Sequence, residues 1–357
     1  MVKVLGYDIG GANTKAAFMH IENGKVLSAD VAVEYLPIWK DSEKLTSVLL
    51  TLKEKLTAGK LDAVGVTMTA ELSDAYQTKR EGVNQILSCV KKAFPNLPIF
   101  VLNTDAELFS PESAQRDPLS VAAANWAATG WLIAQHLKNT IVVDVGSTST
   151  SIIPIANGKV AAKGKTDLDK LICGELVYTG SLRTNVAAIV QSIPLKNDVA
   201  KVSSELFALS GDVHLVLGNI VEADYTSETA DGRGKMIPEA LARLSRVVCA
   251  DTEMLTKQEI INMARYIYEE QIRQIVDGLT KVYMNTKEAA SDNVSVVVTG
   301  LGKNFLARKA VEYLRVEDII DLDTLLPKPA VLATPAAGVA LMTASKLTGE
   351  CIKWTWL

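Results

Sequence analysis

Two segments of the chain carry the same pattern, in which an apolar run ends in an aspartate and small polar residues follow. In the first, VKVLGYDIGGANTKAAFM, the run ends in Asp8 and Gly10 follows two residues later. In the second, NTIVVDVGSTSTSIIPI, Asp144 is followed at the same spacing by Gly146. A second apolar run closes each segment. We therefore expect two β-hairpins in matched register, and the repeat indicates a duplicated domain.

The turns of these hairpins suit phosphate binding. Glycine has no Cβ, so the backbone can approach an anion closely, and N–H and hydroxyl donors converge there. Two facing copies would clamp a di- or polyphosphate, although Gly and Asp also make ordinary turns and Lys15 could be an exposed strand residue. The candidate phosphate ligands are Gly10, Gly11, Asn13, Thr14, Lys15, Gly146, Ser147, Thr148, Ser149 and Thr150.

A divalent cation is the cofactor that this arrangement suggests. A carboxylate at the end of a strand can hold a hydrated Mg²⁺ beside phosphate oxygens. Asp8 and Asp144 are the candidate ligands, and they are counted with the catalytic residues for that reason. The chain offers little else, because its three histidines are isolated and its four cysteines form no C-x-x-C pair. Reduced, mostly buried thiols are expected.

The elements that must position these residues alternate between strands and helices. After the first hairpin, the pattern predicts the order strand, helix, strand, helix, strand, helix, and then restarts near residue 140. The expected strands are Lys25–Val33, Leu61–Met68, Pro98–Leu102 and Val294–Val298. The expected helices are Ser42–Leu56, Val83–Phe94, Ser120–Leu137, Pro238–Cys249, Lys257–Asn285, one from about Lys303 and one from about Pro335. Trp126 and Trp131 on the third helix are expected in the core.

The length of 357 residues allows two domains, each with its own core. We predict a first domain at 1–138 and a second at 139–357, with an insertion at about 164–250. The last helix, about 335–349, is one that can pack back on the first domain. A net charge of −4 gives no reason to expect nucleic acid or an anionic membrane as a partner. No apolar run approaches the roughly 20 residues of a membrane span, so a cytoplasmic protein is expected. The oligomeric state does not follow from the sequence.

Duplicated domains that each open with a phosphate-binding hairpin resemble the actin-like ATPase and sugar kinase superfamily. The resemblance implies a two-lobed α/β fold, related to ribonuclease H, with mixed sheets around a cleft. Gly300 and Gly302, between a strand and a helix, resemble the third, nucleoside-facing loop of that superfamily. Within it, the hairpins DIGGANTK and DVGSTSTS resemble those of the hydantoinase/oxoprolinase branch.

A narrower resemblance covers nearly the whole chain. Many spaced motifs are similar, in order, to one archaeal family, the methanofuran-biosynthesis synthases once labelled tetrahydromethanopterin-linked one-carbon transfer proteins. These motifs are MTAELSD (68–74), TKREGV (78–83), AANWAAT (123–129), GSTSTSIIPI (146–155), KTDLDKL (165–171), ELVYTGSLRT (175–184), ETADGRGK (228–235) and CAD (249–251). Relatives typically carry Asp where this chain has Ser151, which weakens the transfer of a role to that position.

The resemblance implies a transferase of methanofuran biosynthesis. It would join 5-(aminomethyl)-3-furanmethanol diphosphate to γ-glutamyltyramine, forming an aryl ether and releasing diphosphate, without need for ATP. An ATP-dependent small-molecule kinase or a hydantoinase/oxoprolinase-like amidohydrolase is the alternative, since the same turns suit a nucleotide. A non-catalytic, actin-like assembly protein is a third class, which the polar clusters far from the hairpins disfavour.

Such a reaction would use a general base, because the phenol has an ordinary pKa near 10. Glu71 and Asp74 follow the strand Leu61–Met68, and ligands gather at the carboxyl ends of strands in α/β sheets. Glu71 is the first choice and Asp74 the second. Asp74 could equally cap the helix that follows, as could Ser73.

Two further polar segments are candidates for substrate binding. Lys165 and Asp167, with Arg183, could grip a phosphate or the glutamyl carboxylate, since arginine pairs with such groups through two hydrogen bonds. A plain surface turn leading into a helix is the alternative. The glycines of the segment 231–234 suit either a lid or an ordinary surface loop.

Overall fold

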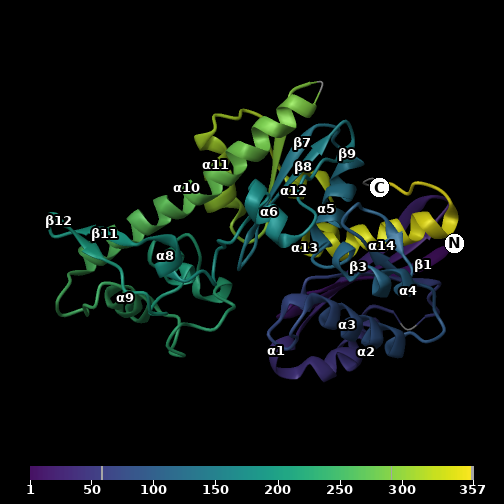
Figure 1. The fold of residues 1–357 in the computed structure, drawn as a ribbon, viewed down its shortest axis with the longest axis horizontal. Coiled ribbons are helices and arrows are strands. Elements are labelled where there is room, and N and C mark those ends of the chain that lie inside the picture. Colours follow the sequence, from purple (N-terminus) through teal and green to yellow (C-terminus); the bar gives the residue numbers. More distant parts are fainter. Residues whose placement is uncertain (58, 291, 355–357) are drawn as a thin grey trace. The chain divides into compact units, whose positions relative to one another are not determined.

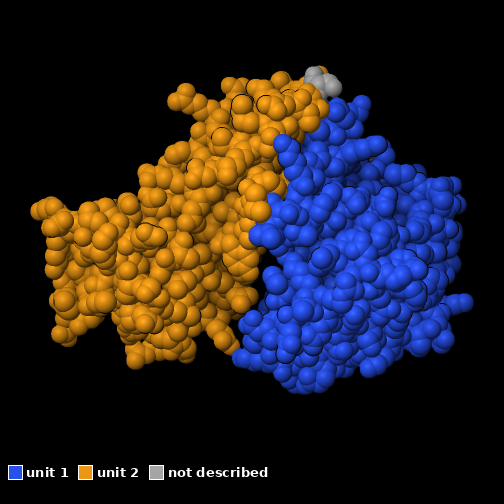
Figure 2. Space-filling model, viewed as in Figure 1, with its two compact units in different colours: residues 1–140, 153–170, 321–357 blue, residues 141–152, 171–320 orange. Residues whose placement is uncertain are grey.

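The computed structural model describes residues 1–57, 59–290 and 292–354. The chain forms two compact units (Figure 2), the first made of 1–140, 153–170 and 321–357 and the second of 141–152 and 171–320. The first boundary lies close to the predicted one at 138/139. The predicted second domain differs, because 153–170 and 321–357 belong to unit 1.

Unit 1 is built on a six-stranded mixed sheet with the order β3-β2-β1-β4-β5-β6. β1 and β2 form the first predicted hairpin, and β2 pairs with β3 in the same antiparallel sense. β1, β4 and β5 are parallel to one another. The strands are β1 (Val2–Ile9), β2 (Asn13–Glu22), β3 (Lys25–Tyr35), β4 (Ala63–Met68), β5 (Ile99–Leu102) and β6 (Leu108–Phe109).

The two faces of this sheet follow the two-residue period of β1. Leu5 and Tyr7 join the core formed with α2 (Leu45–Leu56) and α3 (Lys79–Ala93), whereas Gly6 faces the C-terminal helix α14 (Thr334–Thr348). A Cβ on Gly6 would lie 2.1 Å from the carbonyl oxygen of Ala336, and one on Gly65 would lie 2.2 Å from Thr343 Oγ1. The two glycines therefore let α14 lie directly on the sheet, which places 334–348 in unit 1.

Four helices of unit 1, α2, α3, α5 and α14, were predicted and differ from the predictions only at their ends, whereas the shorter α1, α4, α6, α12 and α13 were not predicted. α3 begins at Lys79 because Thr78, and not Ser73 or Asp74, accepts the capping hydrogen bond from the amide of Glu81. The helix predicted from Ser120 begins only at Asn125, after a 3₁₀ turn and Ala123 at a φ of 51°. The helices are α1 (Ile38–Asp41), α2 (Leu45–Leu56), α3 (Lys79–Ala93), α4 (Pro111–Arg116), α5 (Asn125–Ala134), α6 (Asp167–Cys173), α12 (Leu322–Leu325), α13 (Lys328–Leu332) and α14 (Thr334–Thr348).

The second sheet repeats the central order of the first. Its strands run β10-β8-β7-β13-β14, so the hairpin β7-β8 occupies the place that β1-β2 has in unit 1. β9 pairs with the far end of β8. The strands are β7 (Thr140–Val145), β8 (Thr150–Ala156), β9 (Lys159–Val160), β10 (Leu176–Val177), β13 (Ser295–Thr299) and β14 (Ile319–Asp321).

Unit 2 is organised along the long helix α10 (Lys257–Ala289), which a capping box of Thr256 and Glu259 begins. Its second half packs against β7 and β13, and its first half packs against the predicted insertion, which forms a separate apolar core. That insertion contains the hairpin β11-β12 (Figure 1). The remaining elements are β11 (Ser192–Leu195), β12 (Asp198–Lys201), α7 (Val186–Ile189), α8 (Ser210–Val216), α9 (Ile237–Arg246) and α11 (Arg308–Tyr313).

Candidate active site

The turn of the first hairpin directs its backbone carbonyls inward. The amide of Gly10 closes the turn on the carbonyl of Asn13 at 3.0 Å. The carbonyls of Gly11 and Ala12 accept hydrogen bonds from Ile38 and Leu36 at 2.9 and 3.0 Å. Within 1–57, 59–290 and 292–354, the amides of Gly11 and Ala12 donate no hydrogen bond, so these two donors are available to an anion.

The second hairpin repeats this arrangement in unit 2. The amide of Gly146 closes on the carbonyl of Ser149, again at 3.0 Å. The carbonyl of Gly146 accepts from the amide and hydroxyl of Ser181, and the carbonyl of Ser147 accepts from the amides of Leu182 and Arg183. Among the described residues, the amides of Ser147, Thr148 and Ser149 donate no hydrogen bond. Both turns are thus alike in geometry as well as in sequence.

The hydroxyl groups of the second hairpin divide into two kinds. Ser147 and Thr148 are half-buried, and their hydroxyls lie 3.5 Å apart. Thr150 is fully buried and its hydroxyl donates to the carbonyl of Thr179 at 2.8 Å. Thr150 therefore holds β8 in place, and its predicted role as a phosphate ligand does not fit this position. Arg183 is exposed and reaches Thr148 Oγ1 at 3.5 Å.

The first hairpin places an aspartate and a lysine opposite each other. In the strand register, Asp8 lies opposite Lys15 across the hairpin and opposite Thr67 on β4. Asp8 and Thr14 are buried, and Lys15 is half-buried and makes no ion pair with any described residue. Asn13 is exposed at the end of the turn. Lys15 remains a candidate point charge for a phosphate.

The aspartates fit a cation only as single carboxylate ligands. Asp8 belongs to unit 1 and Asp144 to unit 2. Within the part of the chain that the structure describes, no three His, Cys, Asp or Glu side chains gather at one point. Mg²⁺ is commonly held by one or two carboxylates, phosphate oxygens and water. Either aspartate fits that kind of site, which the phosphate would complete.

Glu71 is a buried carboxyl group, and its own amide and that of Ala123 offset only part of the rise in its pKa. It follows β4 in a 3₁₀ turn (Ala70–Leu72), and neither of its oxygens accepts a hydrogen bond of ordinary geometry. The turn lies beside the first hairpin, because the amide of Thr69 donates to the carbonyl of Ile9 at 2.9 Å. Burial raises the pKa of Glu71 to about 7. Such a pKa suits a group that must take up a proton near neutral pH.

Lys79 lies between Glu71 and a second carboxylate. Its Nζ is 2.6 Å from Asp167 Oδ2 and 4.0 Å from Glu71 Oε1. Burial has the largest effect on the pKa of Glu71, and the charge of Lys79 opposes it while that of Asp167 adds to it. All three residues belong to unit 1. The pKa of Glu71 therefore depends on its burial and on the charges of Lys79 from α3 and Asp167 from α6.

The other predicted residues have local roles in this structure. Asp74 is exposed, so it lacks the burial that makes Glu71 a candidate base. Lys165 forms an ion pair with Asp105 at 2.6 Å. A Cβ on Gly300 would lie 2.4 Å from the carbonyl oxygen of Val145, and one on Gly302 would lie 2.4 Å from the side chain of the same residue. These two glycines therefore allow close packing on β7.

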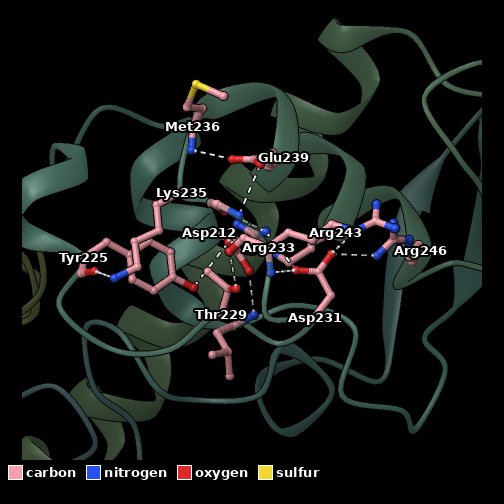
Figure 3. Close-up of polar contacts among 12 residues, drawn as sticks. Asp212, Tyr225, Thr229, Asp231, Arg233, Lys235, Met236, Glu239, Arg243 and Arg246 are labelled. Atoms are coloured by element: carbon pink, nitrogen blue, oxygen red, sulfur yellow. Dashed lines mark hydrogen bonds and ion pairs between the residues drawn. The ribbon is translucent and has the colours of Figure 1, made fainter.

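The polar loop 228–236 is tied to α8 and α9 (Figure 3). Asp231 forms ion pairs with Arg243 at 3.1 Å and Arg246 at 3.0 Å. Arg243 also donates from two nitrogens to Asp212, at 2.8 and 2.9 Å, and both side chains are fully buried. These contacts anchor the loop at Asp231, while the side chain of Arg233 is 67% exposed. An anchored surface loop accounts for them better than a free lid.

Two residues of the site were missed from the sequence, although each leaves a signal there. Lys79 is a cation at the first position of a helix, where the macrodipole disfavours positive charge. Gln271 interrupts the apolar stripe of α10 between Ile267 and Ile275, all of them buried. A polar residue on a buried stripe needs partners elsewhere in the fold.

A cavity of about 430 Å³ in unit 1 contains none of the predicted site residues. Its lining comprises Ser42 and five residues that follow Glu71 in the chain, Ala75, Tyr76, Glu81, Asn84 and Gln85. In the described part of the chain, no helix has both the length and the apolar character needed to cross a bilayer.

Comparison with known proteins agrees with the fold. Residues 62–346 match the sequence model of the hydantoinase/oxoprolinase family. A nucleotide-free structure of acetone carboxylase aligns with a TM-score of 0.57 at 12% identity, covering 95% of this chain and 70% of that one. The two sheets, their repeated hairpins and this match define a hydantoinase/oxoprolinase protein with the actin-like ATPase and sugar kinase fold.

Two curated relatives narrow the assignment. A (4-{4-[2-(gamma-L-glutamylamino)ethyl]phenoxymethyl}furan-2-yl)methanamine synthase from Methanocaldococcus jannaschii is 39% identical over 350 residues, 97% of this chain and 99% of that protein. A synthase of the same name from Methanococcus vannielii is 38% identical over 221 residues, 61% of this chain and 97% of that protein. The chain belongs to this synthase family and is an enzyme.

Proposed function

We propose that this enzyme is a transferase of methanofuran biosynthesis that forms the aryl ether named in its relatives. That name describes a phenol oxygen bound to a methylene carbon on a furan ring. The simplest route joins γ-glutamyltyramine to 5-(aminomethyl)-3-furanmethanol diphosphate. The phenol oxygen bonds to the methylene carbon, the C–O bond to diphosphate breaks, and the phenol proton goes to a base.

The observation that carries the proposal is the pairing, in unit 1, of a buried carboxyl group with an anion-binding turn. Among the described residues, the amides of Gly11 and Ala12 donate no hydrogen bond, and Glu71 follows β4, the strand next to β1. Fixed donors stabilise the negative charge that develops on a departing diphosphate. The equivalent amides of the second hairpin would bind phosphate in the same way.

Glu71 would act as the general base. With a pKa of about 7, it is ionised in part of the population at neutral pH, yet it binds a proton far better than an exposed glutamate. Among the described residues, no donor reaches either oxygen with ordinary hydrogen-bond geometry. The hydroxyl of the phenol would supply that missing donor and pass its proton to the carboxylate as the ether bond forms.

Mg²⁺ would neutralise diphosphate charge when bound. Asp8 or Asp144 would supply one carboxylate ligand, and phosphate oxygens and water would supply the others.

The purified enzyme should release diphosphate only when both substrates are present, and in equal amount to the ether product detected by mass spectrometry. Calorimetry with ATP and Mg²⁺ should show no binding. Diphosphate release without γ-glutamyltyramine, or ATP turnover in the absence of the furan diphosphate, would instead support the kinase or amidohydrolase alternative.

Substitutions that neutralise Lys79 and Asp167 should shift the acidic limb of the pH profile of kcat in opposite directions. Lys79→Met removes a positive charge, which should raise the pKa of Glu71 and move the limb to higher pH. Asp167→Asn removes a negative charge, which should lower that pKa and move the limb to lower pH. Initial rates of diphosphate release between pH 5 and 9 provide the measurement.

Lys91→Met is the matched control, because Lys91 lies on the same helix and pairs with the exposed Glu112. Its limb should coincide with that of the wild type. Shifts of Lys79→Met and Asp167→Asn in the same direction would mean that the acidic limb does not report on Glu71.

A further inference from the structure

A chain of hydrogen bonds runs from α8 through α10 to the segment that packs on the second hairpin. His214 and Gln271 are fully buried, and His214 Nε2 lies 3.0 Å from Gln271 Oε1. Gln271 Nε2 lies 2.9 Å from Thr179 Oγ1 and 2.8 Å from the carbonyl oxygen of Gly180. At the other end, Asn219 Nδ2 lies 3.1 Å from His214 Nδ1.

The direction of this chain follows from its last member. The carbonyl of Gly180 can only accept, so the NH₂ group of Gln271 must point to it, and Gln271 Oε1 must point to His214. His214 therefore carries its proton on Nε2, and its bare Nδ1 accepts from Asn219. Burial lowers the pKa of His214 to about 3, so the ring is neutral throughout the physiological range. The donations therefore run in one direction, from Asn219 through His214 and Gln271 to Gly180.

The chain ends against the backbone of the phosphate-binding turn. A Cβ on Gly180 would lie 2.6 Å from backbone atoms of Thr148 and 2.7 Å from Ser147, so Gly180 packs directly on the turn. The residues that follow Gly180 bind the carbonyls of Gly146 and Ser147. The Thr179 carbonyl holds the hydroxyl of Thr150, where β8 begins. Gln271 thus fixes the segment that orients the amides of the turn.

We propose that the Asn219–His214–Gln271 chain is a positioning device that sets the affinity of the second hairpin for diphosphate. The inference rests on the proposed function of that turn. Gln271 does not touch the anion and acts through Gly180. Fixed amides bind an anion more tightly than mobile ones, because their order is established before binding.

Gln271→Leu removes both donations while keeping an apolar side chain on the stripe of α10. We expect inorganic diphosphate to bind about ten-fold more weakly by calorimetry, the loss of roughly one buried hydrogen bond. The KM for γ-glutamyltyramine should change less than two-fold. Gln271→Glu, which keeps the shape and removes the donor, should act in the same direction if the leucine variant does not fold. Gln274→Leu is the matched control, because Gln274 lies on the same helix and donates only to the carbonyls of Ala188 and Ile189.

Hydrogen exchange separates this inference from the proposed function. In Gln271→Leu, amides of a peptide covering 144–150 should exchange about ten-fold faster, while a peptide covering 8–15 in the first hairpin should not change. Unchanged exchange at 144–150, or equal loss of affinity for both substrates, would overturn the positioning role. Failure of the wild type to bind diphosphate would overturn the proposed function, whereas the exchange result would still stand.

Discussion

Glu71→Gln should lower kcat for ether formation by about 10²–10⁴-fold, the range that a general base typically contributes. The amide has nearly the shape of the carboxyl group but cannot take up the phenol proton. The KM for both substrates should change little, because Glu71 acts on the reacting proton rather than on the diphosphate. Quenched assays of ether product give both constants.

The pH profile of kcat for the wild-type enzyme should report the ionisation of Glu71. A base works only when it is deprotonated, so kcat should fall as the pH drops below about 7, where Glu71 takes up a proton. Glu71→Gln should lose this acidic limb together with most of its activity. Glu54→Gln, at an exposed position on α2, is the control and should keep the limb. A glutamine variant with wild-type kcat would remove Glu71 from the mechanism.

Glu71→Gln should increase the free energy of unfolding at alkaline pH, although it lowers kcat. Burial raises the pKa of Glu71 from 4.5 to about 7, so the folded state binds the proton more tightly than the unfolded state does. This contribution is complete below pH 4.5 and is lost as the pH rises through 7, at a cost of about 3 kcal/mol. Glu71→Gln should therefore be more stable than the wild type at pH 8 and similar at pH 5. Urea unfolding followed by tryptophan fluorescence, which includes the buried Trp126 of unit 1, measures this.

Asp212→Ala should be the most destabilising single substitution in unit 2, at about 3–5 kcal/mol, because it leaves the buried charge of Arg243 without its main partner. Asp212 accepts two hydrogen bonds from Arg243 and one from Tyr225 (Figure 3). Asp231 cannot replace it, because Asp231 already pairs with Arg243 and Arg246 on the other side.

The double variant Asp212→Leu, Arg243→Met is the informative control. It removes both charges, so it should be less destabilised than the sum of the single variants by at least about 1 kcal/mol. No tryptophan falls within 141–152 or 171–320, so unfolding of unit 2 should be followed by hydrogen exchange of peptides from α8 and α9. Additive losses would mean that the two side chains do not depend on each other.

Local patterns in the sequence predicted the two glycine-bearing hairpins and every described helix of ten or more residues, namely α2, α3, α5, α9, α10 and α14. Glycine spacing and β-type runs define Gly10 and Gly146 as turn residues, because a tight turn with exposed amides needs only neighbouring residues. α10 was placed to within a few residues, since a capping threonine and a long apolar stripe are both local signals. The repeat also indicated two sheets of similar order.

Burial and long-range contacts were decided only by the tertiary structure. Thr150 has the same sequence context as Thr148, yet it points into unit 2 and bonds Thr179. Helix α5 begins later than its apolar pattern suggests, because the backbone at Ala123 leaves the helical region. Neither outcome has a local cause, so neither could be predicted from spacing.

The sequence by itself determined the two turns, the carboxylates near them and, through its resemblance to a family, the reaction to expect. Only the folded chain decided which carboxyl group has a raised pKa, because that depends first on the burial of Glu71 in the turn after β4 and then on the charges of Lys79 and Asp167, which α3 and α6 bring beside it. It likewise brought Gln271 to Gly180, which is 91 residues away in the chain. Desolvation and hydrogen-bond partners arise from contacts between distant segments, and a periodic pattern carries no information about those contacts.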